Sequence, residues 1–162
     1  MNKDFLFEKA LDYYNNSLYC DAIWLLDEII CQNPEYEECY FYAGRCCENV
    51  FFESKAIEYY LKGIEKCSNK EYTSDYHLHI GNCYIKLSKI KDAILHYDEA
   101  ANFEGNHIVA QLNKARAFVC IKEYEKALAI FEQVKEAEVG DATYIDKYVK
   151  YCKTKHQAQK RF

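Results

Sequence analysis

Residues that interrupt helices are scarce in this chain, which contains one proline and five glycines among 162 residues. Proline cannot continue a helix and glycine destabilises one, so a chain with few of either can be helical almost throughout, with short turns. No apolar run is as long as a membrane span, and the first residues, Met1 to Asp4, lack the apolar stretch of a signal peptide. We expect an all-α protein of the cytoplasm, or alternatively the nucleus, that has no contact with a membrane.

The motifs that commonly mark an enzyme or a metal site are also missing. The sequence has no glycine-rich phosphate loop, no Gly-x-Ser-x-Gly, no Cys-x-x-Cys and no His-Glu-x-x-His. His79 and Cys83 share one face of a predicted helix, with His77 nearby, but a metal ion would require three or four such ligands. A groove histidine and a core thiol are the favoured interpretation. We therefore predict no catalysis, no cofactor and no metal.

Nine cysteines form no recognisable disulfide framework, because their number is odd and their spacing irregular. Several fall on apolar positions of predicted helices, as Cys47 does. Reduced thiols that act as small hydrophobic side chains explain such a pattern, and they fit a reducing compartment.

Charge is distributed unevenly along the sequence. Residues 1–141 contain 15 Lys and Arg against 25 Asp and Glu, whereas residues 142–162 contain six against one. The acidic body argues against nucleic acid as the main ligand. The basic end is interpreted as a solubilising cap, with binding to an acidic partner or a neighbouring copy as the alternative.

A pair of small residues recurs four times, at a spacing of about 34 residues. An alanine stands four residues before a large apolar side chain, and a second small residue stands twelve residues before that alanine. The four sets, each in chain order, are Ala10, Ala22 and Leu26; Gly44, Ala56 and Tyr60; Gly81, Ala93 and Tyr97; and Ala115, Ala127 and Phe131. Small residues allow two helices to approach closely, and large ones fill the space between them. Such a unit must stack on its neighbours to bury its apolar face, which is typical of a binding scaffold.

This pattern resembles the tetratricopeptide repeat family, whose 34-residue unit has small residues at positions 8 and 20 and aromatic ones at 11 and 24. The four repeats cover about 3–36, 37–70, 74–107 and 108–141, and a capping helix covers about 142–157. The sequence departs from the family at position 4, where its tryptophan is replaced, and only Pro34 remains of its closing prolines. The resemblance implies one domain over 1–162, a right-handed α-solenoid of helical hairpins that binds proteins. We further expect the third repeat to begin near Ser74, after a small insertion, and Asp141 to cap the last helix.

In this family the first helix of each hairpin lines a concave groove, where ligands usually lie. The resemblance implies that positions 2, 5, 6, 9, 12 and 13 of each repeat face this groove, and the predicted binding residues are taken from positions 5, 6 and 9. The predicted partner-binding residues are Phe7, Leu11, Phe41, Tyr42, Arg45, Leu78, His79, Asn82, Leu112, Asn113 and Arg116. A peptide or partner helix with apolar anchors suits this surface, and Arg45 and Arg116 would pair with its carboxylates. Two alternatives to ligand binding remain open. Phe7 and Phe41 would instead pack between successive first helices, and Arg45 would instead be held by Glu48, three residues later on the same helix.

Some family members are co-chaperones that grip the acidic end of a heat-shock chaperone with a clamp of Lys, Asn and Arg residues. Starting from the third repeat, the clamp positions hold Leu78, Asn82, Asn113, Thr143 and Lys147. The two asparagines fit and Lys147 keeps a charge, but Leu78 and Thr143 do not fit. This function is the least favoured of the three considered.

Several aromatic residues have no packing role in the family pattern, and they are concentrated before residue 80. They are Tyr14, Tyr36, Tyr42, Tyr59, Tyr72 and Tyr76, with Phe51 and Phe52 at a predicted turn. Aromatic residues are over-represented at interfaces. The alternative function is therefore a self-associating subunit of a large assembly, similar to the tetratricopeptide subunits of the anaphase-promoting complex, with the first repeats forming a homodimer.

Overall fold

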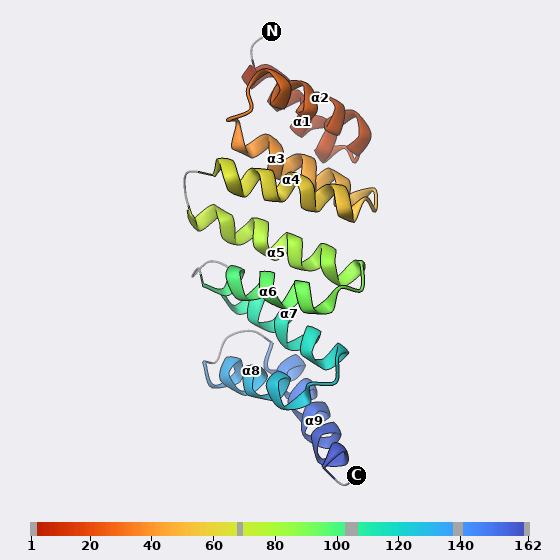
Figure 1. The fold of residues 1–162 in the computed structure, drawn as a ribbon, viewed down its shortest axis with the longest axis vertical. Helices are drawn as coiled ribbons and strands as arrows, with labels where there is room; N and C mark the ends of the chain where they lie inside the picture. Colours follow the sequence, from red (N-terminus) through yellow and green to blue (C-terminus); the bar gives the residue numbers. More distant parts are fainter. Residues whose placement is uncertain (1–2, 68–69, 103–106, 138–140, 161–162) are drawn as a thin grey trace.

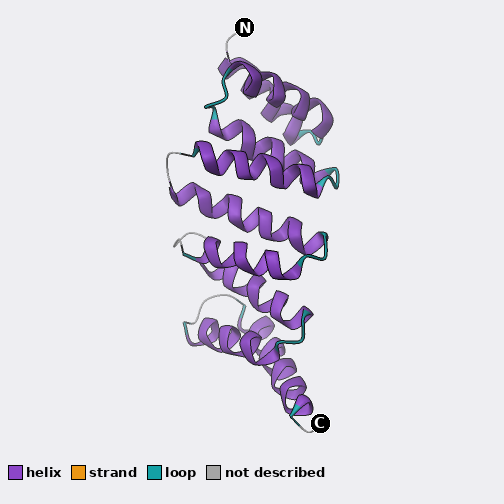
Figure 2. Ribbon diagram, in the orientation of Figure 1, coloured by secondary structure: helices purple, strands orange, loops and turns teal. Residues whose placement is uncertain are grey.

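The computed structural model describes residues 3–67, 70–102, 107–137 and 141–160, and within them it contains nine α-helices and no strand (Figures 1 and 2). Consecutive helices pack against one another in a single stack, with the two termini at opposite ends (Figure 1). The A helices are α1 (Lys3–Asn15), α3 (Glu37–Asn49), α5 (Lys70–Lys86) and α7 (His107–Cys120). The B helices are α2 (Tyr19–Gln32), α4 (Glu53–Lys66), α6 (Ile90–Ala101) and α8 (Tyr124–Glu136), and α9 (Ala142–Gln159) closes the stack. The predicted all-α helical solenoid is confirmed.

The turn within each hairpin has one recurring conformation. One residue in each turn has a left-handed backbone with φ near 60°, and these residues are Ser17, Phe51, Ser88 and Lys122. The next amide N–H donates to the carbonyl oxygen five residues back, for example Phe52 N to Cys47 O at 2.9 Å. This is the Schellman arrangement, which satisfies the last carbonyls of the A helix. It usually employs glycine, so this chain makes four such turns without the residue best suited to them.

The small residues lie where two helices of a hairpin touch, as the repeat pattern predicts. A Cβ atom added to Gly44 would lie 2.3 Å from the ring of Tyr60, and one added to Gly81 would lie 2.5 Å from the ring of Tyr97. The first and fourth hairpins instead combine alanine with a residue other than tyrosine, since Ala10 accompanies Leu26 and Ala115 accompanies Phe131. All four large residues are almost fully buried. Glycine thus occurs in the two hairpins in which a tyrosine covers the small residue.

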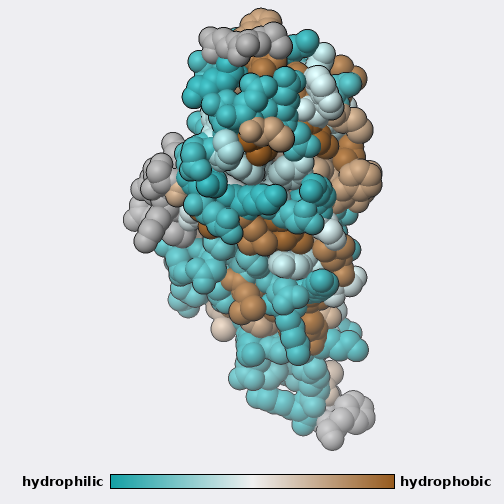
Figure 3. Space-filling view, turned by 45° about the horizontal axis from the view of Figure 1, so that its top comes forward, coloured by the Kyte–Doolittle hydropathy of each residue, from teal (hydrophilic) through white to brown (hydrophobic). Residues whose placement is uncertain are grey.

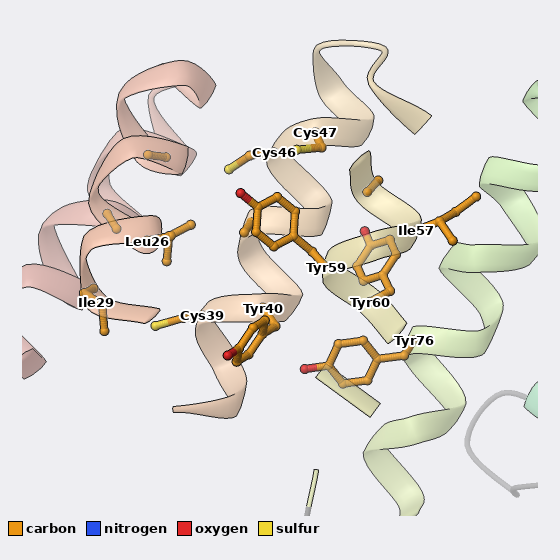
Figure 4. Close-up of a cluster of buried hydrophobic side chains, with 14 of the residues drawn as sticks. Leu26, Ile29, Cys39, Tyr40, Cys46, Cys47, Ile57, Tyr59, Tyr60 and Tyr76 are labelled. Atoms are coloured by element: carbon orange, nitrogen blue, oxygen red, sulfur yellow. The ribbon is translucent and has the colours of Figure 1, made fainter. Parts of the chain in front are cut away.

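Buried side chains form a core that continues through the stack rather than one central cluster. One cluster extends from Leu6 on α1 to Cys83 on α5, and a second joins α7, α8 and α9 (Figure 4 shows part of the first). Five of the nine cysteines are buried and none forms a disulfide. Burial raises the pKa of Cys39, Cys46 and Cys83 to about 12, which keeps them as protonated, unreactive thiols. The interpretation of cysteine as a small core residue is confirmed for these positions.

The first helix of the third hairpin begins earlier than predicted. Helix α5 starts at Lys70 rather than near Ser74, so the extra residues lengthen the helix. Ser74 lies inside the helix, is 2% exposed, and its Oγ donates a hydrogen bond to the carbonyl oxygen of Ala100 at 3.0 Å. The predicted cap was wrong because this hydroxyl joins two helices instead of ending one.

The last helix begins as predicted. The carboxylate of Asp141 accepts hydrogen bonds from the backbone N–H groups of Thr143 at 2.9 Å and Tyr144 at 3.2 Å. Two ion pairs then connect α9 to α8: Lys135 with Asp146, and Lys153 with Glu132. Part of the basic end is therefore folded against the chain's own acidic residues. No helix in the described ranges combines the length and the apolar character needed to cross a bilayer.

Candidate functional site

The side chains at positions 5, 6 and 9 of the A helices form what we call the groove face. Ten of its eleven predicted residues are partly buried, and Arg116 is exposed. Arg116 also lies close enough to Tyr97 and Tyr144 for its charge to act on both hydroxyls. The groove face is thus accessible along its length, while most of its side chains also contact the core.

An aromatic row of five side chains crosses the first two A helices, α1 and α3, and it comprises Tyr14, Phe7, Tyr36 (directly before α3), Tyr42 and Phe41. The ring centroid of Phe7 lies 5.1 Å from that of Tyr36 and 5.7 Å from that of Tyr42. Tyr42 also meets Tyr14 at 5.5 Å and Phe41 at 5.8 Å, both edge to face. Edge-to-face pairs of this kind fix the rings relative to one another. The row is therefore a rigid, partly exposed apolar surface.

Phe41 ends the aromatic row and shows that the two interpretations of position 5 are not exclusive. Its ring lies 5.3 Å from Tyr76 and 5.5 Å from His79, both on α5, so it packs between successive A helices. It is nevertheless only partly buried. Leu78 and Leu112 behave similarly, since each packs against a core cluster and keeps some exposure.

A buried polar network lies beneath the middle of the groove face. Glu48 Oε1 lies 2.8 Å from His79 Nδ1 and accepts a hydrogen bond from the Tyr60 hydroxyl at 2.5 Å. Burial alone would raise the pKa of Glu48, but the contacts with His79 and Tyr60 outweigh it, so the pKa lies below its ordinary value. Arg45 Nη1 lies 3.4 Å from His79 Nε2. The carboxylate therefore orients His79, and His79 in turn contacts Arg45.

This network answers a question that the sequence left open. Glu48 is 13% exposed at its side chain and is occupied by His79 and Tyr60, so it does not line the groove as a free carboxylate. Arg45 contacts His79, on the next A helix. The spacing along α3 showed that Glu48 lies three residues after Arg45, but it did not show that Arg45 contacts His79 on α5.

The two asparagines of the groove face lie together. Asn113 Nδ2 donates to Asn82 Oδ1 at 3.3 Å, and the same oxygen accepts the Tyr97 hydroxyl at 2.8 Å. Asn82 is thus held by an adjacent A helix and by its own hairpin. The amide pair fills two of the five positions of the chaperone clamp, but Leu78 and Thr143 stand at two other clamp positions that they do not fit.

Two hollows of opposite character open beside the groove face. The α3–α5 hollow has a volume of about 260 Å³ and is lined by aromatic and acidic side chains, namely Glu37, Glu38, Phe41, Tyr42, Cys67, Asp75 and Tyr76. The α7–α9 hollow has a volume of about 420 Å³ and is lined by Val119, Tyr144, Lys147, Tyr148 and Tyr151. Both have tyrosine walls, but carboxylates line the first and a lysine lines the second.

Two of the tyrosines thought to be free for an interface belong to the core instead. Tyr59 is 7% exposed and donates a hydrogen bond to Asp27 at 2.7 Å, and Tyr76 is 3% exposed and donates to the carbonyl oxygen of Glu37 at 3.0 Å. Both contacts join neighbouring repeats, which the pattern of a single repeat does not reveal. The side chain of Tyr72 lies outside the described part. Phe51 and Phe52 are exposed, at 79% and 62%.

Sequence reasoning also missed the contribution of α9 to the site. Tyr144 and Tyr148 line the α7–α9 hollow, and the ring of Tyr148 stacks on Phe131 at 5.0 Å. Treating α9 only as a cap concealed this, although Tyr144, Tyr148 and Tyr151 follow one another at intervals of four and three residues, which places them on one face of the helix. Within the described residues, no group of three or more His, Cys, Asp and Glu is arranged to hold a metal ion.

Comparison with known proteins bears on the fold. Neither a family model nor a curated relative matches the sequence. Solved structures do match: a MamA protein is 21% identical over 86% of this chain and 79% of its own, with a TM-score of 0.69. YrrB, a TPR protein with an unusual peptide-binding site, is 17% identical over 81% of this chain and 66% of its own, also at 0.69. A Podosopora anserina putative kinesin light chain with nearly identical TPR-like repeats is 12% identical over 98% and 88%, at 0.73.

These likenesses define the class of the molecule through its fold. The chain has the tetratricopeptide-repeat fold, as the recurring small and aromatic residues indicated. At these levels of identity the likeness extends to the architecture and not to a particular ligand.

Proposed function

We propose that the protein is a non-enzymatic adaptor that binds an extended peptide or a partner helix on its groove face. The observation that carries this proposal is the aromatic row, which remains partly exposed across α1 and α3 and ends at Phe41, beside α5. Rings held rigidly by one another lose little conformational entropy when a ligand covers them. Rigid aromatic anchors next to hollows are typical of binding hot spots.

The polar groups of the groove face favour a polypeptide ligand. Arg45, Asn82 and Asn113 alternate with apolar side chains along successive A helices, which fits a ligand with both apolar anchors and backbone or carboxylate acceptors. YrrB, which has the same fold, is a TPR protein with a peptide-binding site. That likeness supports the class of ligand, and the groove residues of this chain support its position.

A random 12-residue peptide library, selected on the purified protein, tests the proposal. Selected peptides should bind the wild type, and Tyr42→Ala should weaken them about tenfold or more, as expected for an aromatic hot spot. Leu95→Ala is the matched control, because Leu95 is 64% exposed on the B helix α6. The proposal fails if no peptide is enriched, or if both substitutions have the same effect.

Self-association is the second candidate, and a separate surface favours it. Phe51 and Phe52 lie at the α3–α4 turn, where the backbone of Phe51 has φ of 61°. The turns within the hairpins lie along the right-hand edge of the stack in Figure 1, and Figure 3 shows apolar colour on that side as well as in patches over the middle of the molecule. An exposed aromatic pair of this kind suits a contact with a second copy.

Light scattering over a tenfold range of concentration distinguishes this candidate. A dimer would have a mass of about 38 kDa, twice the 19.2 kDa of the chain, and Phe52→Glu should return it to one chain without loss of helicity. Phe52 is a better test position than Phe41, because Phe41 packs on Tyr76 and His79 and its substitution would disturb the core. A mass of one chain at every concentration excludes this candidate.

A further inference from the structure

The α3–α5 hollow differs from the rest of the groove face in its charge. Phe41 and Tyr42 contribute aromatic walls from α3, and Tyr76 contributes one from α5. Three carboxylates line the same space: Glu37 and Glu38 in the first turn of α3, and Asp75 on α5. A hollow of about 260 Å³ is large enough for one long side chain but not for a folded element.

The walls of the hollow are held in place before any ligand arrives. The rings of Phe41 and Tyr76 meet edge to face at 5.3 Å, and the Tyr76 hydroxyl is anchored on the carbonyl oxygen of Glu37 at 3.0 Å. Phe41 and Tyr42 meet at 5.8 Å. A preformed aromatic surface presents its negative ring faces to a cation without a cost of reorganisation.

Negative charge is also felt at a hydroxyl that lines the hollow. Burial is the main cause that raises the pKa of Tyr76, and Glu37 and Glu38 are among the charges that raise it further. The carboxylates of the hollow therefore favour a cation beside its rings.

We infer that the α3–α5 hollow receives a lysine or arginine side chain of the bound peptide. This inference rests on the proposed function and specifies one feature of the ligand. The apolar stem of the side chain would lie against Phe41 and Tyr42, and its cationic head would face Glu38. Charge complementarity selects this occupant, because the α7–α9 hollow has similar aromatic walls but is lined by Lys147.

The peptide selection provides the test, with the library and its best member as probes. Peptides selected on the wild type should be enriched in lysine or arginine at one position. Replacement of that residue by norleucine, which keeps a four-carbon stem without the charge, should weaken binding about tenfold on the wild type. On Glu38→Gln the same replacement should have a clearly smaller effect, because one of the facing charges is gone.

Two further variants make the result specific. Glu38→Lys should shift the preference of a new selection away from basic residues, whereas Lys147→Gln, which removes a positive charge from the α7–α9 hollow, should leave that preference unchanged. Glu38 is exposed, so neither of its substitutions should lower the melting temperature appreciably.

The inference is overturned if selected peptides bind through Tyr42 but show no preference for a basic residue, or if norleucine weakens them equally on Glu38→Gln. Both results would leave the proposed function intact. A library that yields no peptide sensitive to Tyr42→Ala contradicts the proposed function itself.

Discussion

Gly44→Ala is the substitution whose effect follows most directly from the packing of the hairpins. At an unconstrained helical position, replacing glycine with alanine stabilises a protein by about 1 kcal/mol, because alanine is the better helix former. Here the new Cβ would lie 2.3 Å from Cε1 of Tyr60 and 2.7 Å from Cδ1 and Cζ, and Tyr60 is completely buried. The ring has little freedom to move, since its hydroxyl is bonded to Glu48 and its face stacks on His79.

Overpacking of a well-packed core costs about 1–3 kcal/mol, and a contact this short belongs at the upper end of that range. After subtraction of the gain in helix propensity, we expect Gly44→Ala to lower the free energy of unfolding by about 2 kcal/mol. For a chain of this size, that corresponds to a melting temperature about 4–8 °C lower. Urea denaturation followed by circular dichroism measures the difference.

The first hairpin supplies the matched control, because it combines Ala10 with Leu26. In a Tyr60→Leu background, Gly44→Ala recreates that pair and should cost much less than it does beside Tyr60. A double-mutant cycle measures this coupling. The packing argument is refuted if Gly44→Ala alone stabilises the protein, or if the two substitutions are additive.

Three further predictions concern other parts of the stack. His77 Nδ1 and His96 Nδ1 lie 3.0 Å apart, and burial is the main cause that lowers the pKa of both. The unfolded chain therefore binds more protons than the folded one, so the free energy of unfolding should fall as the pH drops below about 6.5. Denaturation series between pH 7.5 and 5.5 measure this fall, which should be less steep in His96→Asn. Phe51→Gly should raise the free energy of unfolding by about 1 kcal/mol, because it relieves a left-handed backbone at an exposed residue; an unchanged urea midpoint would contradict the strain. A thiol reagent should rapidly modify the three exposed cysteines, Cys20, Cys31 and Cys120, and it can also reach the partly buried Cys67. The five buried cysteines should react only after unfolding. Rapid reaction of more than four thiols in the native protein would contradict their burial.

The fold could be predicted from the sequence because its determinants are local. Each hairpin requires small residues at fixed separations from a large one, and Gly44 with Tyr60 illustrates how such a pair reports a contact between two helices. The start of α5 could not be predicted in the same way. Ser74 is a good capping residue in isolation, but its hydroxyl bonds to Ala100 on α6, and only the packed structure reveals that partner.

The candidate site was predictable in outline and not in detail, for a related physical reason. Periodicity identified which positions share the groove face, such as Phe41 and Tyr42. It did not show which of their neighbours are free for a ligand, because Tyr76 and Glu48 find their partners in adjacent helices. Contacts between repeats depend on how the helices stack, and the spacing within one repeat does not contain that information.

Hydrogen–deuterium exchange with and without the best selected peptide tests the central claim most directly. If the peptide lies on the groove face, amide exchange should slow in α1, α3 and α5, while the B helices α2 and α4 and the α3–α4 turn remain unchanged. Protection confined to the B helices or to the turn at Phe51 and Phe52 would contradict the account.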